Sequence, residues 1–186
     1  MLDQPTEIPH LMLPRHAGTR LVLAHWLALY RSNENRIPER GQLDPLQFAK
    51  ALDEVFIYEF DGADFVCRLV GERTQENFGF SLRNRPMREI LGKEVYPSVF
   101  GFFKTCIDSP AIYKNIGLLY SDPDMDRDQG ERLLLPTRSG SGVLNHVFGC
   151  TATIRADDDE PSQAQRELFR FQEGEPIADA PPIPGD

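Results

Sequence analysis

Hydrophobic residues begin to alternate with period two at Val55, and this pattern constrains the fold more than any other feature of the chain. Val55 to Phe60 and Phe65 to Val70 flank Asp61-Gly62-Ala63-Asp64, which predicts a β-hairpin. Three further strand patterns follow at Ile112 to Tyr120, Arg132 to Arg138 and Val143 to Ile154. The sequence therefore predicts an α+β fold with a five-stranded antiparallel sheet.

Short helices are predicted between the two groups of strands. The segments are Thr74 to Phe78, Met87 to Leu91 and Ser98 to Ile107, the first two ended by Gly79 and Gly92. We expect these helices to lie on one face of the sheet. Two more helices precede the first strand, one from Thr19 to Arg31 and one that begins at Asp44-Pro45. They predict an N-terminal helical cap.

These patterns divide the chain into four segments. Residues 1–18 are predicted to be a flexible leader, 19–54 the helical cap, 55–156 the core, and 157–186 a mostly disordered tail. The tail is rich in proline and holds nine acidic and two basic residues, so most of the net charge of −9 lies there. Within it, a capping box at Ser162 and Gln165 predicts one short helix, with Leu168 and Phe171 on its apolar face.

Net charge and cysteine content limit the binding partners and the cellular compartment that we expect for the protein. Residues 1–156 are nearly neutral and the pI is about 4.9, so neither nucleic acid nor an anionic membrane surface is an expected partner. The densest apolar run, Leu21 to Tyr30, is short for a membrane span. Three widely separated cysteines favour reduced thiols and a cytoplasmic location.

Motifs for catalysis and for metal binding are absent from the sequence. The alternating aspartates from Asp122 to Asp128 lack the glycine and glutamate of a calcium loop, so no metal is expected. His146 alternates with apolar residues on the last predicted strand. A buried structural histidine is one interpretation, and proton transfer by His146 in a small α+β enzyme is the alternative.

Several segments together resemble the PAS sensor-domain family. They are Asn77 to Ser81, Ile90 to Lys93 and the hairpin Leu135 to Val143; Trp26 to Arg31, Ile37 to Arg40, Asp44-Pro45 and Phe65 to Gly71 are similar to short stand-alone bacterial PAS-like proteins. The resemblance implies a regulatory module, usually dimeric, and implies no reaction. Residues 88–109 lack the histidine of haem-binding members, and Cys67 falls in a strand, unlike the reactive cysteine of flavin photosensors. No cofactor is therefore expected.

The resemblance also implies a ligand pocket between the sheet and the short helices. The candidate lining residues are Phe65, Cys67, Leu69, Phe78, His146 and Phe148. Four of the six could equally be plain core. The predicted function is that of a non-enzymatic cytoplasmic sensor in bacterial signalling, acting through a small apolar or metabolite ligand, through contact with a signalling protein, or through both.

The first predicted helix is apolar around nearly its whole circumference, whereas a helix on one sheet needs an apolar stripe. We therefore predict a homodimer, whose interface residues are Leu21, Val22, Trp26, Leu29 and Tyr30. The alternative is burial of the helix within the chain, under the leader from Ile8 to Pro14 or under the second helix.

Overall fold

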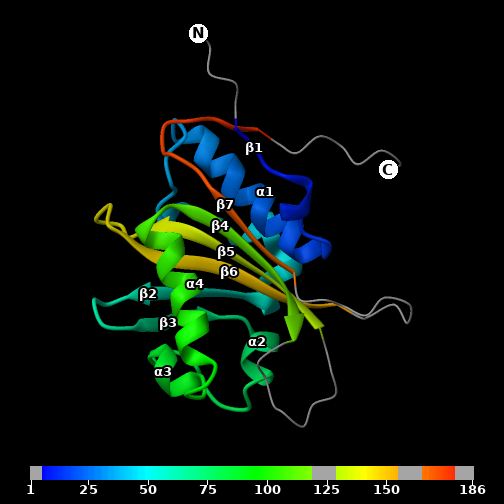
Figure 1. Cartoon of the computed structure of the whole chain (residues 1–186), viewed down its shortest axis with the longest axis vertical. Coiled ribbons are helices and arrows are strands. Elements are labelled where there is room, and N and C mark those ends of the chain that lie inside the picture. Colours follow the sequence, from blue (N-terminus) through cyan, green and yellow to red (C-terminus); the bar gives the residue numbers. More distant parts are fainter. Residues whose placement is uncertain (1–5, 119–128, 155–164, 179–186) are drawn as a thin grey trace.

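The computed structural model describes residues 6–118, 129–154 and 165–178, and a six-stranded antiparallel sheet lies at its centre (Figure 1). The strand order is β3-β2-β6-β5-β4-β7. The strands are β2 (Val55–Phe60), β3 (Phe65–Val70), β4 (Ala111–Leu118), β5 (Gln129–Arg138), β6 (Leu144–Ile154) and β7 (Gln165–Arg170). A short parallel pair, β1 (Thr6–Glu7) and β8 (Ile177–Ala178), lies outside this sheet. The α+β class and the antiparallel core sheet are confirmed, with one strand more than predicted.

The additional strand, β7, corrects the prediction for the acidic tail. β7 pairs antiparallel with β4, from Ala111 opposite Arg170 to Ile116 opposite Gln165. The predicted helix is wrong here. The open edge of β4 offers hydrogen-bond partners to the backbone of residues 165–170, and a strand buries Phe169 against the cap. A capping box is a local signal and does not outweigh these long-range contacts. The tail residues 157–164 and 179–186 lie outside the described residues.

The three helices between β3 and β4 cover one face of the sheet (Figure 1). They are α2 (Glu72–Glu76), α3 (Met87–Ile90) and α4 (Tyr96–Asp108). Helix α4 buries Val99, Phe103, Cys106 and Ile107, which recur at three or four residues and so form one stripe. The grouping of short helices predicted from the sequence is therefore present.

The N-terminal cap covers the opposite face. It consists of η1 (His10–Met12), α1 (Ala17–Ser32), η2 (Arg40–Gln42) and η3 (Pro45–Glu54). The predicted second helix is the 3-10 segment η3, which is interrupted by the non-helical backbone of Phe48. Asp44 caps it as predicted, since its carboxylate accepts a hydrogen bond of 3.0 Å from Leu46 N.

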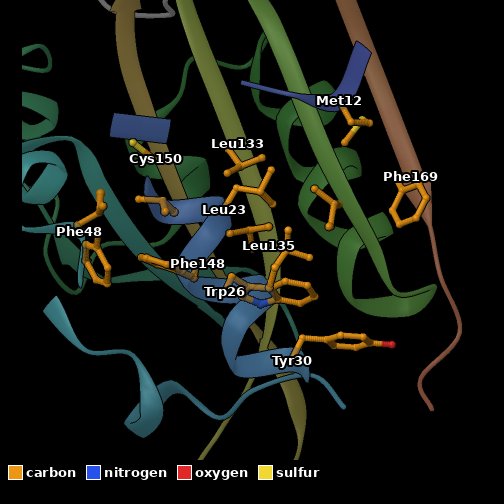
Figure 2. Packing of buried hydrophobic residues seen from close by; sticks show 14 of the residues in the cluster. Met12, Leu23, Trp26, Tyr30, Phe48, Leu133, Leu135, Phe148, Cys150 and Phe169 are labelled. Atoms are coloured by element: carbon orange, nitrogen blue, oxygen red, sulfur yellow. The ribbon is translucent and has the colours of Figure 1, made fainter. Parts of the chain in front are cut away.

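Both faces of the sheet are consequently buried, and the chain has two hydrophobic cores. Strand β5 shows this directly, because Leu133 and Leu135 face the cap, whereas Leu134 faces α4. Figure 2 shows the first core, in which Trp26 of α1 lies beside Leu135 and Phe148. We call it the cap core, and the cluster under α2 to α4 the helix-side core.

Helix α1 buries one side within the chain, whereas Ala24 and Ala28 on the other side are exposed. Val22, Trp26 and Tyr30 are fully buried, and Leu21 and Leu29 are half-buried. Trp26 Nε1 donates to Pro136 O at 2.9 Å, and Tyr30 Oη donates to Glu175 O at 2.9 Å. The interpretation of Val22, Trp26 and Tyr30 as dimer contacts is therefore corrected, because the sheet and the segment after β7 cover them.

The N-terminus of α1 is held by a buried carboxylate. Glu131 of β5 accepts hydrogen bonds from Arg15 N at 2.7 Å, His16 N at 2.8 Å and Thr19 Oγ1 at 2.6 Å. The helix starts at Ala17, two residues before the predicted N-cap Thr19. A carboxylate at this end satisfies backbone donors that lack partners within the helix and complements the helix dipole.

Gly149 of β6 provides a test of the packing between the sheet and the helix-side core. A Cβ at this position would lie 2.3 Å from Phe56 Cζ and 2.7 Å from Leu133 O. We expect Gly149→Ala to lower the free energy of unfolding by about 1–3 kcal/mol, because the added methyl overpacks the site. Urea denaturation followed by circular dichroism measures the change.

The matched control is Gly101→Ala in α4, where a Cβ meets nothing within 4 Å. This change should raise the free energy of unfolding by about 0.5–1 kcal/mol, because alanine restricts the unfolded chain and favours the helix. A Gly149→Ala protein as stable as the wild type would contradict the close approach of Phe56.

Candidate ligand cavity

A cavity of about 60 Å³ lies between the sheet and the helices α2 to α4. This volume admits a few water molecules or a ligand of a few heavy atoms. The cavity is lined from both layers by Phe56, Tyr58, Thr74, Asn77, Phe78, Met87, Leu91, Val99, Phe103, Arg132 and Thr151. Its position between the sheet and the short helices is the one that the resemblance to PAS domains implies.

Aromatic rings form the apolar wall of the cavity. Phe103 of α4 stacks on Phe56 with 6.0 Å between ring centroids and meets Tyr58 edge-on at 5.3 Å. All three rings are buried. Because β2 presents Phe56 and Tyr58 on the same face, both rings pack against Phe103 of α4.

The lining also includes polar residues. Thr74 Oγ1 of α2 is buried and has no hydrogen-bond partner among the described residues. Arg132 of β5 donates from Nε to Thr151 Oγ1 of β6 at 3.2 Å, across a pair of residues in register. Asn77 adds a side-chain amide. None of the described lining residues is acidic.

Phe65, Cys67 and Phe78 of the predicted lining lie on this side of the sheet, and Phe78 lines the cavity. Phe65 and Cys67 are fully buried in the helix-side core. Burial raises the pKa of the Cys67 thiol to about 11, so the thiol stays protonated at neutral pH. Cys67 is accordingly a packed residue here and has no nucleophilic character.

Leu69 turns away from the cavity because β3 contains a bulge. Tyr58 pairs with Cys67 and Ile57 with Leu69, so Arg68 is an extra residue in β3. A bulge of this kind reverses the alternation of the residues that follow it. Leu69 therefore points to the other face and is 39% exposed.

His146 and Phe148 also lie on the other face of the sheet. Phe148 belongs to the cap core, where its ring centroid is 5.4 Å from that of Phe48. The cavity face of β6 carries the intervening residues, including Thr151. Alternation in the sequence identified this strand, but both of its faces are buried, so the pattern did not indicate which face meets the pocket.

His146 lacks a carboxylate within hydrogen-bond distance among the described residues. Its Nε2 lies 4.0 Å from Glu59 Oε2, and Glu59 accepts a hydrogen bond of 2.8 Å from Arg68 Nε. The His146 Nδ1 lies 2.8 Å from Asn145 Oδ1. Burial lowers the pKa of His146 although Glu59 opposes the shift. This geometry gives the enzymatic alternative no support.

Thr74, Arg132 and Thr151 are cavity residues that the sequence analysis did not identify. A weak signal existed for Arg132, which precedes Leu133 and Leu134 and shares the face of the second. Thr74 sits in a helix of five residues, α2, whose own pattern does not distinguish a buried side.

Two further findings apply to residues 6–118, 129–154 and 165–178. No group of three or more histidine, cysteine, aspartate or glutamate side chains there is placed to hold a metal ion. No helix in those ranges has the length and apolar character needed to cross a membrane. The aspartates from Asp122 to Asp128 lie outside the described residues.

A central antiparallel sheet carries short helices on one face, with the cavity between the two layers. A family model described as a PAS domain matches residues 14–152. The chain therefore belongs to the PAS domain family, whose members are typically non-enzymatic sensory domains of signal transduction. No curated protein matches the sequence.

The comparison with solved structures matches this chain at 14–15% identity and TM-scores of 0.42–0.43. A sensory box sensor histidine kinase from Vibrio cholerae has a TM-score of 0.42 and 15% identity, covering 60% of this chain and 92% of that chain. The PAS domain of a protein from Colwellia psychrerythraea has a TM-score of 0.42 and 15% identity, with 60% and 98% covered. The dark structure of the blue-light photoreceptor Aureochrome1 LOV has a TM-score of 0.43 and 14% identity, with 66% and 91% covered. The family assignment rests on the sequence match.

The unpaired hydroxyl of Thr74 predicts a change in stability. Thr74→Val replaces it with a methyl group of the same shape, and we expect the free energy of unfolding to rise by about 1 kcal/mol, because a buried hydroxyl without a partner is unfavourable. Chemical denaturation measures this change. The matched control is Thr105→Val in α4, which removes a hydrogen bond of 2.8 Å to Gly101 O and should not stabilise the protein. Equal effects of the two substitutions would contradict the prediction.

The lowered pKa of His146 predicts a dependence of stability on pH. Above roughly pH 6.5 the imidazole is neutral in both the folded and the unfolded chain. Below this pH the unfolded chain binds a proton that the folded chain does not, so the free energy of unfolding falls until the folded pKa is reached. We expect His146→Gln to lose stability less steeply than the wild type on acidification. Urea denaturation at neutral and mildly acidic pH measures both slopes, and identical slopes would refute this assignment.

Proposed function

We propose that the protein is a sensory module that binds a small molecule in the cavity and reports its presence to a signalling protein. The cavity carries this proposal, since its lining is mostly aromatic and aliphatic with a few polar residues, as in small-molecule sites of proteins. Its position in a PAS domain, between the sheet and the short helices, supports the same function. A cytoplasmic setting and a role in bacterial signalling belong to this proposal.

Strand β5 supports a route from the cavity to the opposite side of the molecule. Arg132 lines the cavity, and its neighbour Glu131 faces the cap, where it holds the N-terminus of α1. A ligand that shifts β5 at Arg132 therefore acts on the strand that anchors α1. In this proposal the cap passes the signal to the partner.

A homodimer also remains part of the proposal. Its interface on α1 would use fewer residues than the five that the sequence predicts. Of the five interface candidates, Leu21 and Leu29 are partly accessible, whereas the other three are buried within the chain. Native mass spectrometry of the purified protein measures the oligomeric state, and we expect the mass of a dimer.

Ligand binding is tested with a variant whose cavity is filled. Val99 lines the cavity, and Val99→Phe adds a ring there. We expect saturation-transfer NMR with a library of small soluble metabolites to reveal compounds that bind the wild type and are lost in Val99→Phe, because the ring occupies their space.

The matched control is Val143→Phe, because Val143 is 55% exposed in the turn between β5 and β6. This variant should retain every compound that the wild type binds. Circular dichroism confirms that each variant is folded. A library without any compound that distinguishes Val99→Phe from Val143→Phe would overturn the sensory function.

A further inference from the structure

We propose that the outer edge of β7 is a docking site for an extended acidic segment of a partner protein. The segment adds a strand to the sheet, with acidic residues opposite Arg166 and Arg170 and an apolar residue opposite Leu168. The inference goes beyond the proposed function, because it does not depend on a ligand in the cavity. Strand β7 lies outside residues 14–152, so this edge is not part of the matched PAS domain.

The outer edge of β7 carries backbone groups that β4 does not pair. Strand β7 is the last strand of the sheet and lies beside β4 (Figure 1). Phe171 N donates to Pro110 O at 3.2 Å, and the register between the two strands has no bulge. Hydrogen-bonded pairs alternate along an antiparallel ladder, so the N–H and C=O groups of every second residue point away from β4. These residues are Arg166, Leu168 and Arg170.

The two edges of the sheet differ in how they are covered. At the edge formed by β3, the loop after α2 pairs with the strand, since Cys67 N donates to Arg85 O at 3.0 Å and Asn84 N donates to Cys67 O at 2.7 Å. No backbone group among residues 6–118, 129–154 and 165–178 pairs with the outer edge of β7. An uncovered edge is a template for the addition of another strand.

Side chains at this edge favour an acidic partner. Leu168 is 41% exposed, and the exposed Arg166 and Arg170 flank it on the same side of the strand. Arg166 lies over the Phe102 ring, 5.1 Å from its centroid, and Arg170 Nη1 donates to Ser109 Oγ at 3.3 Å. Neither guanidinium is paired with a carboxylate in the described part of the chain. Opposite charges on facing strands stabilise the pairing.

A second copy of the chain fits this edge less well. Glu167, the acidic residue of β7, belongs to the other side of the strand and is paired in register with Lys114 of β4. Two β7 strands paired antiparallel about Leu168 bring Arg166 of each copy opposite Arg170 of the other, and facing like charges destabilise a sheet. The edge therefore favours a segment with acidic residues at its first and fifth positions and an apolar residue at its third.

Amide hydrogen exchange and an NMR titration on the full chain test the proposal. In the free protein, the amides of Arg166, Leu168 and Arg170 should exchange faster than those of Glu167 and Phe169, which β4 protects. The probe is a blocked seven-residue peptide with glutamate, valine and glutamate at its even positions and threonine elsewhere. It should protect the three outward amides and bind roughly tenfold more tightly than the same peptide with lysine in place of glutamate.

Variants of β7 separate the backbone contribution from that of charge. Leu168→Pro removes an outward N–H and leaves the hydrogen bonds to β4, because proline is tolerated at edge positions whose N–H faces away from the sheet. This variant should lose the peptide, whereas its control Leu168→Ala retains the N–H and should bind. The double variant Arg166→Glu, Arg170→Glu should bind the lysine peptide more tightly than the glutamate peptide.

The matched control for charge is the double variant Arg20→Glu, Arg83→Glu, which changes the net charge equally at two exposed residues outside β7. It should retain the preference for glutamate. Circular dichroism confirms that each variant is folded, and if Leu168→Pro does not fold, the charge-reversed variant of β7 decides.

Three results would overturn the docking site. Protection of the outward amides without peptide shows another segment of the chain on the edge, or a second copy if protection rises with protein concentration. Equal binding of the glutamate and lysine peptides contradicts selectivity for an acidic segment. Unchanged binding in Leu168→Pro contradicts strand addition. None of these results affects the sensory function, which is tested separately by the compounds that Val99→Phe loses.

Discussion

Strands β5 and β6 carry buried side chains on both faces, and this property requires a cover on each side of the sheet. Alternate residues of β5 contribute to different cores, with Leu133 and Leu135 under the cap and Leu134 under α4. A sheet with one wet face would need one layer of helices. Here the cap is as much a part of the folded unit as α2 to α4, and strand β7 pairs with the edge of β4.

Two neighbouring charged residues show how closely the two sides are connected. Glu131 holds the N-terminus of α1 on the cap side, and Arg132 lines the cavity on the helix side. Successive residues of a strand point to opposite faces. Glu131 and Arg132 therefore reach the two sides of the sheet although a single peptide bond joins them. Burial makes Glu131 expensive to move, since three donors depend on its carboxylate. The cap and the cavity thus share a rigid element in the interior of the sheet.

The site could be predicted in its location but not in most of its residues. Family likeness indicated the space between the sheet and the short helices, and Phe78 lies there. Leu69 was misplaced by a bulge at Arg68, which reverses the alternation without a clear signal in the sequence. His146 and Phe148 were misplaced because the more apolar face of β6 packs against the cap, whereas the face that carries Val147 and Thr151 meets the helix side. Thr74 was missed because a buried hydroxyl without a hydrogen-bond partner is visible only in the structure.

Local patterns in the chain were sufficient for the element types and their order. Turn residues at Asp61-Gly62 and alternation in the flanking strands specify a hairpin whatever surrounds it. Long-range contacts determined the structure of the segments whose local patterns were ambiguous. Residues Gln165–Arg170 became a strand because β4 had an open edge, and Trp26 became a core residue because the sheet and Phe171 surround it. Such outcomes depend on surfaces that exist once distant segments have come together, and no local pattern encodes them.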